Sequence, residues 1–167
     1  MKWQPLFLGS LALLLIQGAS AQTKPDDRIK TRQAAFTVIA ANVGKIKTNL
    51  DGEYKKQDVL DAATVIQSLA HTNVASWFPA GTNTGNGFHE TQVKGAWFEA
   101  ENAKKAADAS NKFKDEADQL AIVAALGDKD AVQAQFGKLR GTCKGCHDNF
   151  RVDSTQTAAA PAPAANK

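Results

Sequence analysis

The sequence predicts an all-α fold, an antiparallel up-down-up-down four-helix bundle, and three observations lead to this prediction. Four segments carry apolar residues at helical spacing, two of the three connections between them are short, and the pattern lacks the sustained alternation of a strand. Short connections join antiparallel neighbours, so the four helices are expected to surround one core. A length of 167 residues suits a single domain.

The first helix is expected to begin at Pro25 and to end at Gly52. A proline followed by Asp26 and Asp27 is typical of a helix N-terminus, where the helix dipole favours negative charge. From Phe36 onward the apolar residues recur at steps of three and four, which predicts the buried seam of a bundle. The apolar positions of this helix are Ile29, Phe36, Ile39, Val43, Ile46 and Leu50.

The second helix is expected from about residue 56 to residue 73, and a long loop follows it. Its apolar stripe consists of Val59 or Leu60, Ala63, Ile66, and Leu69 or Ala70. The loop runs from Ser76 to Gln92 and is rich in glycine, asparagine and threonine, which favour turns. Loops longer than about 12–15 residues are uncommon and are often functional.

The third helix is expected from about residue 93 to residue 126, with a break between Gly95 and Asn102, and the fourth from about residue 129 to residue 152. Gly127 ends the third helix, and the acidic residues just after it suit the N-cap of the fourth. The third helix presents a buried face of Trp97, Ala106 or Ala107, Phe113, Ala117, Leu120 and Val123. The fourth presents Val132, Phe136, Leu139, Cys143, Cys146 and Phe150, so both cysteines are expected to face the core.

Residues 1–21 have the composition of a secretory signal peptide. A lysine precedes an apolar run from Leu6 to Ile16, which is shorter than the ~20 residues of a membrane-spanning helix, and an Ala-Ser-Ala cleavage site follows. The alternative is an uncleaved anchor helix. We expect a periplasmic mature protein without a membrane segment, folded over residues 22–152 and ending in a flexible Ala/Pro-rich tail at residues 153–167.

The charge of the chain is close to balanced, which argues against nucleic acid as a partner. Removing the signal peptide removes one lysine and no acidic residue, so the formal net charge of +3 becomes +2. Lysine and arginine are scattered among aspartate and glutamate, without the dense basic block that nucleic-acid binding requires.

The stretch "GTCKGCHDNFRV" near the C-terminus holds both cysteines of the chain, Cys143 and Cys146, followed directly by His147. C-x-x-C-H is the attachment sequence of c-type haem. Two thiols three residues apart lie on one face of a helix, where they can form thioether bonds with the two vinyl groups of one porphyrin. The adjacent imidazole is then placed to ligate the iron. The motif therefore predicts one covalently attached haem c.

Three other interpretations of the paired cysteines are less consistent with the sequence. A redox disulfide of the thioredoxin type usually lies at a helix N-terminus after a strand, whereas this pair lies late in a helix. A structural zinc site needs four ligands, and the remaining histidines, His71 and His89, are unpaired. A purely structural disulfide within one helix would be strained.

The chain resembles the cytochrome c′ family over about residues 25–151. The stretch "CKGCHDNFR" is similar to the family pattern C-K-x-C-H-x-x-[YF]-R, and "IKTRQAAF" in the first helix is similar to I-K-x-R-Q-x-x followed by a large apolar residue. The resemblance implies a haem-binding four-helix bundle that usually forms homodimers through its first two helices. The exposed apolar residues Val38 and Val65 are compatible with such a dimer.

The resemblance also implies cofactor-binding roles for seven residues. They are Cys143, Cys146, His147, Arg32, Gln33, Phe36 and Arg151. The cysteines would hold the porphyrin and His147 would be the proximal iron ligand, with Arg151 against the same face. Arg32 would lie near a haem propionate and Phe36 over the distal face of the iron. The alternatives are an ordinary core role for Phe36 and a surface ion pair with Asp148 for Arg151.

A sixth iron ligand is not expected. The only methionine is Met1, which leaves with the signal peptide, and we expect His71 to be a surface or interhelical residue and His89 to be solvated. The prediction is a five-coordinate, high-spin iron under an apolar roof, which suits NO or CO and argues against oxygen storage and peroxidase activity.

The sequence therefore predicts a gas-binding protein rather than an enzyme, and NO sequestration is its expected role. The alternative function is electron transfer to a periplasmic redox partner. A structural bundle without haem is a more distant alternative.

Overall fold

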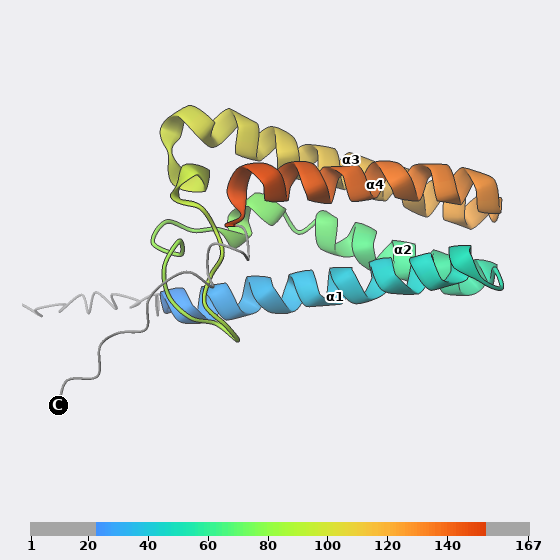
Figure 1. The fold of residues 1–167 in the computed structure, drawn as a ribbon, viewed down its shortest axis with the longest axis horizontal. Helices are drawn as coiled ribbons and strands as arrows, with labels where there is room; N and C mark the ends of the chain where they lie inside the picture. The colour runs from blue at the N-terminus through green and yellow to red at the C-terminus, as the bar shows by residue number, and fades with distance from the viewer. Residues whose placement is uncertain (1–22, 153–167) are drawn as a thin grey trace, which may run out of the picture.

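The structure, a computed structural model, describes residues 23–152 (Figure 1). The predicted signal peptide at residues 1–21 and the predicted tail at residues 153–167 lie outside these residues. The described chain contains four α-helices, which confirms the all-α four-helix bundle: α1 (Pro25–Asp51), α2 (Lys56–Ala70), α3 (Ala103–Leu126) and α4 (Lys129–Phe150).

The helices run up, down, up and down along one long axis (Figure 1). Two short links, one between α1 and α2 and one between α3 and α4, lie together at what we call the closed end of the bundle. The long segment between α2 and α3 crosses the opposite end, which we call the open end, beside the start of α1 and the end of α4. Helix α2 packs against α1 and α3, and α3 packs against α4.

The long segment has more structure than the predicted loop. It contains three 3₁₀ turns: η1 (Val74–Trp77), η2 (Gly95–Phe98) and η3 (Ala100–Asn102). The predicted end of the second helix at residue 73 is wrong, because α2 ends at Ala70 and Asn73 adopts a left-handed conformation with φ of 58°. Such a residue cannot continue a right-handed helix.

The predicted break between Gly95 and Asn102 is confirmed, because the turns η2 and η3 lie there and Glu99 between them is extended. The helix itself, α3, begins only at Ala103, so the predicted helical start at residue 93 is wrong. The backbone before it bonds to the end of α4 instead: the Lys94 N–H donates to the Phe150 carbonyl over 2.8 Å. The Val152 N–H likewise donates to the Gln92 carbonyl over 2.8 Å. These bonds end α4 at Phe150, two residues before the predicted limit.

The predicted signals at the start of α4 are confirmed. The Asp128 carboxylate accepts hydrogen bonds from the backbone N–H groups of Asp130 and Ala131, at 2.9 and 3.2 Å. Gly127, just before it, has a φ of 84°, which an L-residue with a side chain adopts only under strain.

The core follows the predicted seams, with one exception in α1. Residues Ile29, Ile39 and Ile46 are buried, and Phe36 is half-buried between them. Arg32 stands in the same series, three residues after Ile29 and four before Phe36, and only 3% of it is exposed. An arginine therefore occupies a position of the seam that a simple bundle would give to an aliphatic residue.

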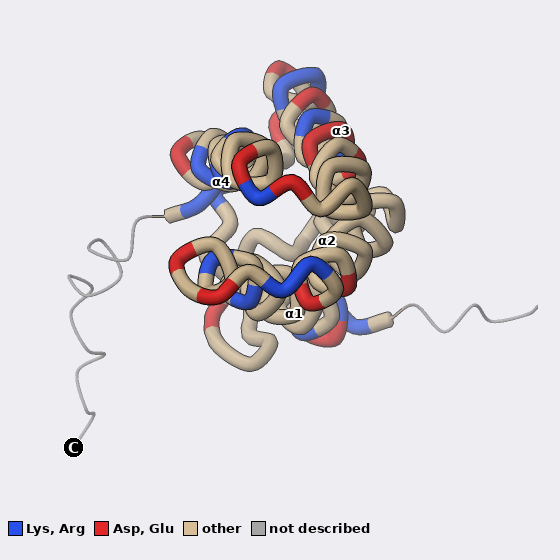
Figure 2. Tube along the Cα trace, turned by 90° about the vertical axis from the view of Figure 1, so that its right-hand side faces the viewer, with Lys and Arg blue, Asp and Glu red and all other residues tan. Residues whose placement is uncertain are grey.

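Basic and acidic residues both occur on all four helices, scattered among uncharged residues (Figure 2). No helix in residues 23–152 is long and apolar enough to cross a membrane. Val38 and Val65, on α1 and α2, are exposed by 45% and 37%, which is compatible with the expected dimer.

Candidate functional site

A cavity of about 540 Å³ opens at the open end of the bundle, between α1, α3, α4 and the long segment. Its volume lies within the roughly 300–1,000 Å³ typical of cofactor pockets. Aromatic rings make up much of its wall: Phe36, Phe78, Trp97, Phe113 and Phe150. All seven sequence-predicted site residues line it, which are Arg32, Gln33, Phe36, Cys143, Cys146, His147 and Arg151. The structure thus brings together residues more than 100 positions apart in the chain.

Cys143 and Cys146 lie on the α4 wall of the cavity as half-buried free thiols. Their spacing of three residues places both on the face of α4 that looks into the bundle. Burial raises the pKa of the Cys143 thiol, and burial followed by the neighbouring Cys143 raises the pKa of Cys146 to about 11. Both groups are therefore protonated thiols at neutral pH.

His147 lies at the rim of the same wall, in the last turn of α4. Its pKa is below the ordinary value, first because its ring is partly withdrawn from water and then because of the positive charge of Arg151. Asp148 acts in the opposite direction. The neutral imidazole that these conditions favour is the form of histidine that ligates metals.

Arg151 caps the C-terminus of α4 and contacts the long segment. Its Nε and Nη2 groups donate to the Gln92 side-chain oxygen over 2.9 and 2.6 Å. The alternative contact with Asp148 is not the one formed, because Asp148 pairs with Lys144 over 2.6 Å. The arginine therefore joins the end of α4 to the cavity rim.

Arg32 is a buried cation on the α1 wall. Its guanidinium donates to the Thr82 hydroxyl (2.8 Å), the Thr82 carbonyl (2.7 Å) and the Thr91 hydroxyl (2.5 Å), and it lies 4.8 Å from the Phe78 ring centre. Burial lowers its pKa to about 10. No carboxylate of residues 23–152 lies within ion-pair distance of it. A buried charge with only neutral partners makes this wall favourable for an anion.

Gln33, next to Arg32, holds the long segment against α1. Its side-chain oxygen accepts from the Phe88 N–H over 2.7 Å, and its amide group donates to the His89 carbonyl over 2.9 Å. The backbone at Gly87 comes so close that a Cβ there would lie 2.3 Å from the Gln33 oxygen. Only glycine fits this position without movement of the loop.

Phe36 begins a chain of aromatic contacts around the cavity. Its ring meets Trp77 at 5.2 Å in an edge-to-face arrangement and Phe78 at 6.1 Å. Phe78 in turn lies 4.3 Å from Trp97, and Trp97 lies 5.0 Å from Phe150. The α1 and α4 walls are thus connected by rings.

Several residues of the site come from the long segment and were not identified from the sequence: Phe78, Thr82, Thr91 and Gln92. The available signal was the aromatic run Trp77-Phe78 in an otherwise polar loop. Such a run marks a buried anchor, because large rings are costly to leave in water. It does not identify the helix that the anchor contacts.

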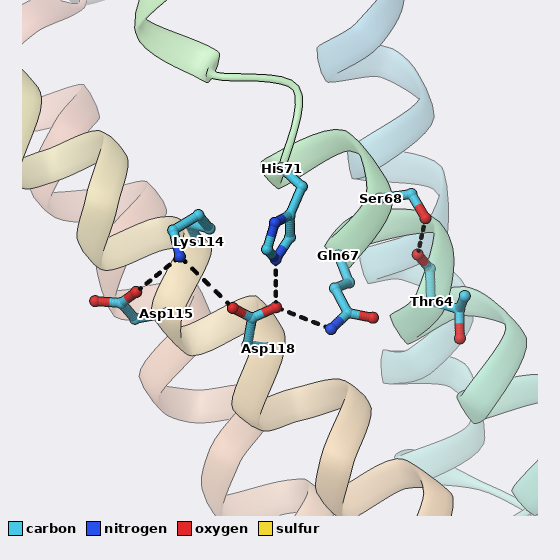
Figure 3. Close-up of polar contacts among 7 residues, drawn as sticks. All are labelled: Thr64, Gln67, Ser68, His71, Lys114, Asp115 and Asp118. Carbon is cyan, nitrogen blue, oxygen red and sulfur yellow. Dashed lines mark hydrogen bonds and ion pairs between the residues drawn. The ribbon is translucent and has the colours of Figure 1, made fainter.

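The two remaining histidines lie in different places. His71, at the end of α2, contacts Asp118 of α3 over 2.7 Å and does not line the cavity, which agrees with the expected interhelical role (Figure 3). His89 is exposed on the long segment at the cavity rim, and its Nδ1 lies 2.8 Å from the Glu90 carbonyl.

The cavity fits a covalently bound haem. It supplies two adjacent thiols, an imidazole beside them and an aromatic wall for the ring system. It also supplies the buried cation Arg32 for a carboxylate of the cofactor.

Fold and site together define the class: a helical-bundle protein of the c-type haem group. The family model described as cytochrome c′ matches residues 27–151. The chain belongs to the cytochrome c′ family, whose members carry covalently bound haem c, and haem c is its cofactor.

The chain is similar to relatives over nearly their whole length. It is 46% identical over 129 residues to cytochrome c′ of Rhodocyclus tenuis, covering 77% of this chain and 96% of that protein. A solved cytochrome c′ described as having a ligand-controlled dimer dissociation is 36% identical, with a TM-score of 0.75, covering 80% of this chain and all of that one.

Two solved variants of the Alcaligenes xylosoxidans cytochrome c′ are also similar in structure. One is described as carbon monoxide bound, with 26% identity, a TM-score of 0.68, and coverage of 78% of this chain and 98% of that one. The other is described as ferrous with bound NO, with 25% identity, a TM-score of 0.67, and coverage of 77% and 98%.

Proposed function

We propose that this chain is a periplasmic haem protein that binds small diatomic gases, NO above all, and limits NO toxicity by sequestering it. The observation that carries the proposal is the asymmetry of the cavity. One wall offers an imidazole, His147, and the facing α1 wall offers the apolar ring of Phe36. An iron held from one side only, by one protein ligand, keeps a position free for a gas.

The α4 wall would hold the cofactor. Cys143 and Cys146 would form the two thioether bonds, and His147 would be the axial ligand of the iron. When bound, the haem supplies an iron centre that takes diatomic ligands. The lowered pKa of His147 supports this assignment, since the imidazole needs no deprotonation before it binds a metal.

The α1 wall would recognise and shield the cofactor. Arg32 would balance the charge of a propionate carboxylate, which its lack of an ion-pair partner among residues 23–152 supports. Gln33 would act indirectly, by holding the long segment over the cavity edge. Arg151 would place a positive charge beside His147.

Phe36 would limit what can bind. A phenyl ring donates no conventional hydrogen bond, so bound dioxygen or peroxide would gain no polar stabilisation from it. It also takes up space, which selects for small ligands. A binding role without turnover follows, and for this reason we assign the protein no enzymatic activity.

Two comparisons support the gas-binding proposal. The Alcaligenes xylosoxidans structures carry CO and NO, and the similar protein with ligand-controlled dimer dissociation links a ligand to assembly. We extend both properties to this chain: it binds these gases and forms a homodimer through α1 and α2. The exposed residues Val38 and Val65 support that interface.

The visible spectrum of the ferrous protein with and without NO tests the proposal. We expect the broad bands of a five-coordinate high-spin haem, which change when NO is added. Sharp split bands in the reduced protein, insensitive to NO, would contradict gas binding and favour an electron carrier with six ligands.

The role of Phe36 has its own test. Phe36→Ala should speed CO association measured after flash photolysis, because the steric barrier is removed. Phe88→Ala is a matched control, since Phe88 is exposed by 67% and does not line the cavity. An unchanged rate in Phe36→Ala would place the ring away from the ligand.

A further inference from the structure

Trp77 does not line the cavity but contacts a residue that does. It ends the turn η1, is half-buried, and meets the Phe36 ring edge-to-face with ring centres 5.2 Å apart. Phe36 lines the cavity, whereas Trp77 does not. Any influence of Trp77 on a ligand in the cavity therefore passes through a neighbour, and Phe36 is the ring that it contacts.

The turn that carries Trp77 is held in place at its start. Val74 is buried in the main core, and the Asn73 carbonyl accepts from the Ser76 N–H over 2.8 Å. Just before the turn, Asp118 of α3 binds two residues at the end of α2. It contacts His71 over 2.7 Å and accepts from the Gln67 amide over 2.8 Å (Figure 3).

The residue after Trp77 is held as well. Phe78 packs against Trp97, with ring centres 4.3 Å apart. The Arg32 guanidinium lies 4.8 Å from the centre of the Phe78 ring. The Phe36 ring therefore rests on two aromatic rings: Trp77, which packs against the main core, and Phe78, which packs against Trp97 and lies beside the buried arginine. A side chain so supported resists displacement.

We propose that Trp77 is a positioning residue for gas binding, which holds the Phe36 ring in the cavity and thereby slows the entry of a diatomic ligand. The inference rests on the proposed function, in which the ligand enters on the Phe36 side. A ligand that must push the ring aside has to break the edge-to-face contact. Removal of that contact lowers the barrier, while removal of Phe36 itself makes the contact irrelevant.

The test is a double-mutant cycle on CO association, measured by flash photolysis of the haem-loaded protein with Trp77→Ala, Phe36→Ala and both changes. One aromatic contact corresponds to an increase of about 2- to 10-fold for Trp77→Ala. In the Phe36→Ala background the same change should add nothing. Trp77→Phe keeps an aromatic partner and should return most of the slow rate.

A second variant distinguishes a positioning role of Trp77 from a general loss of stability. Phe98→Ala removes a half-buried ring that packs against the cluster of Trp97, Ala106 and Phe150 and does not line the cavity, so it should lower the unfolding temperature without changing the CO rate. In a crystal structure of Trp77→Ala, the Phe36 ring should occupy more than one position.

The outcomes are distinct. A CO rate unchanged in Trp77→Ala but raised in Phe36→Ala overturns the inference and leaves the proposed function intact. An equal effect of Trp77→Ala in both backgrounds also overturns it, because Trp77 would then act without Phe36. An unchanged rate in Phe36→Ala itself removes both the inference and the proposed role of Phe36.

Discussion

The two ends of the bundle use the same helical seam for different purposes. At the closed end, Ile46 of α1 is fully buried and belongs to one core with Val59, Leu120 and Val132. At the open end, the same seam of α1 carries Arg32 and lines a cavity of about 540 Å³. The difference shows that the α1 wall of the site needs no change of helix geometry, only a charge or a ring at seam positions in place of an aliphatic side chain. The long segment supplies further rings of the cavity, Phe78 and Trp97.

This comparison predicts that the two ends can be damaged independently, and the largest effect is expected at the thiols. Replacing Cys143 and Cys146 together by serine should abolish covalent haem attachment, because a hydroxyl oxygen does not take the place of the thioether sulfur. Haem staining after denaturing electrophoresis measures covalent haem attachment. Haem that survives denaturation in the double variant would contradict the attachment site.

A change at the closed end should lower the stability of the protein and leave the haem site unchanged. Ile46→Ala should lower the free energy of unfolding by about 2–5 kcal/mol, the usual cost of removing a large buried aliphatic side chain. Covalent haem and the CO spectrum should stay as in the parent protein. Chemical denaturation followed by circular dichroism gives the stability, and a changed CO spectrum would show that the ends are coupled.

Arg32→Met tests the buried cation at the open end. The change removes three hydrogen bonds to Thr82 and Thr91 and should cost about 1–3 kcal/mol of stability. In the proposed haem site it also removes a positive charge from the cavity wall, so the ferric form would gain stability and the reduction potential should fall. Spectroelectrochemical titration measures the potential. Arg28→Met, an exposed change on the same helix, is the control and should leave the potential unchanged.

The smallest change in stability is expected at Asp118, on α3. Its pKa lies below the ordinary value of about 3.9, first because Gln67 and then because His71 donates a hydrogen bond to the carboxylate. A carboxyl whose pKa falls on folding stabilises the protein above that ordinary value and loses this contribution as the pH drops through the folded pKa.

Asp118→Asn should therefore be less stable than the parent at neutral pH by less than about 1 kcal/mol. The two proteins should converge once the pH falls below the folded pKa of Asp118, where both side chains are neutral. Thermal unfolding at a series of pH values measures the difference. A gap that stays constant down to low pH would show that the loss comes from packing and not from the charge.

The α4 part of the site could be predicted from the sequence because it is continuous along one helix. Cys143, Cys146, His147 and Arg151 lie within nine residues, so helical spacing alone determines which face they share. Arg32 and Phe36 lie about 110 residues earlier, and only the family resemblance linked them to α4. The structure places them on the facing wall.

The long segment could not be predicted in the same way. Phe78, Thr82 and Gln92 reach the site through contacts with α1 and α4, and no periodic pattern marks such contacts in a loop. The start of α3 was misplaced for a related reason. The backbone near Lys94 bonds to the end of α4, so a tertiary contact replaces the local helix.

Gly87 has no side chain, and this helps to keep water away from the Arg32 guanidinium. The loop lies directly on α1 because glycine has no Cβ, and this close contact brings the loop's threonines over the guanidinium. A methyl group at position 87 would lift the loop and let solvent hydrate the cation. The electrical environment of the cavity thus depends on a residue that carries no charge and does not line it.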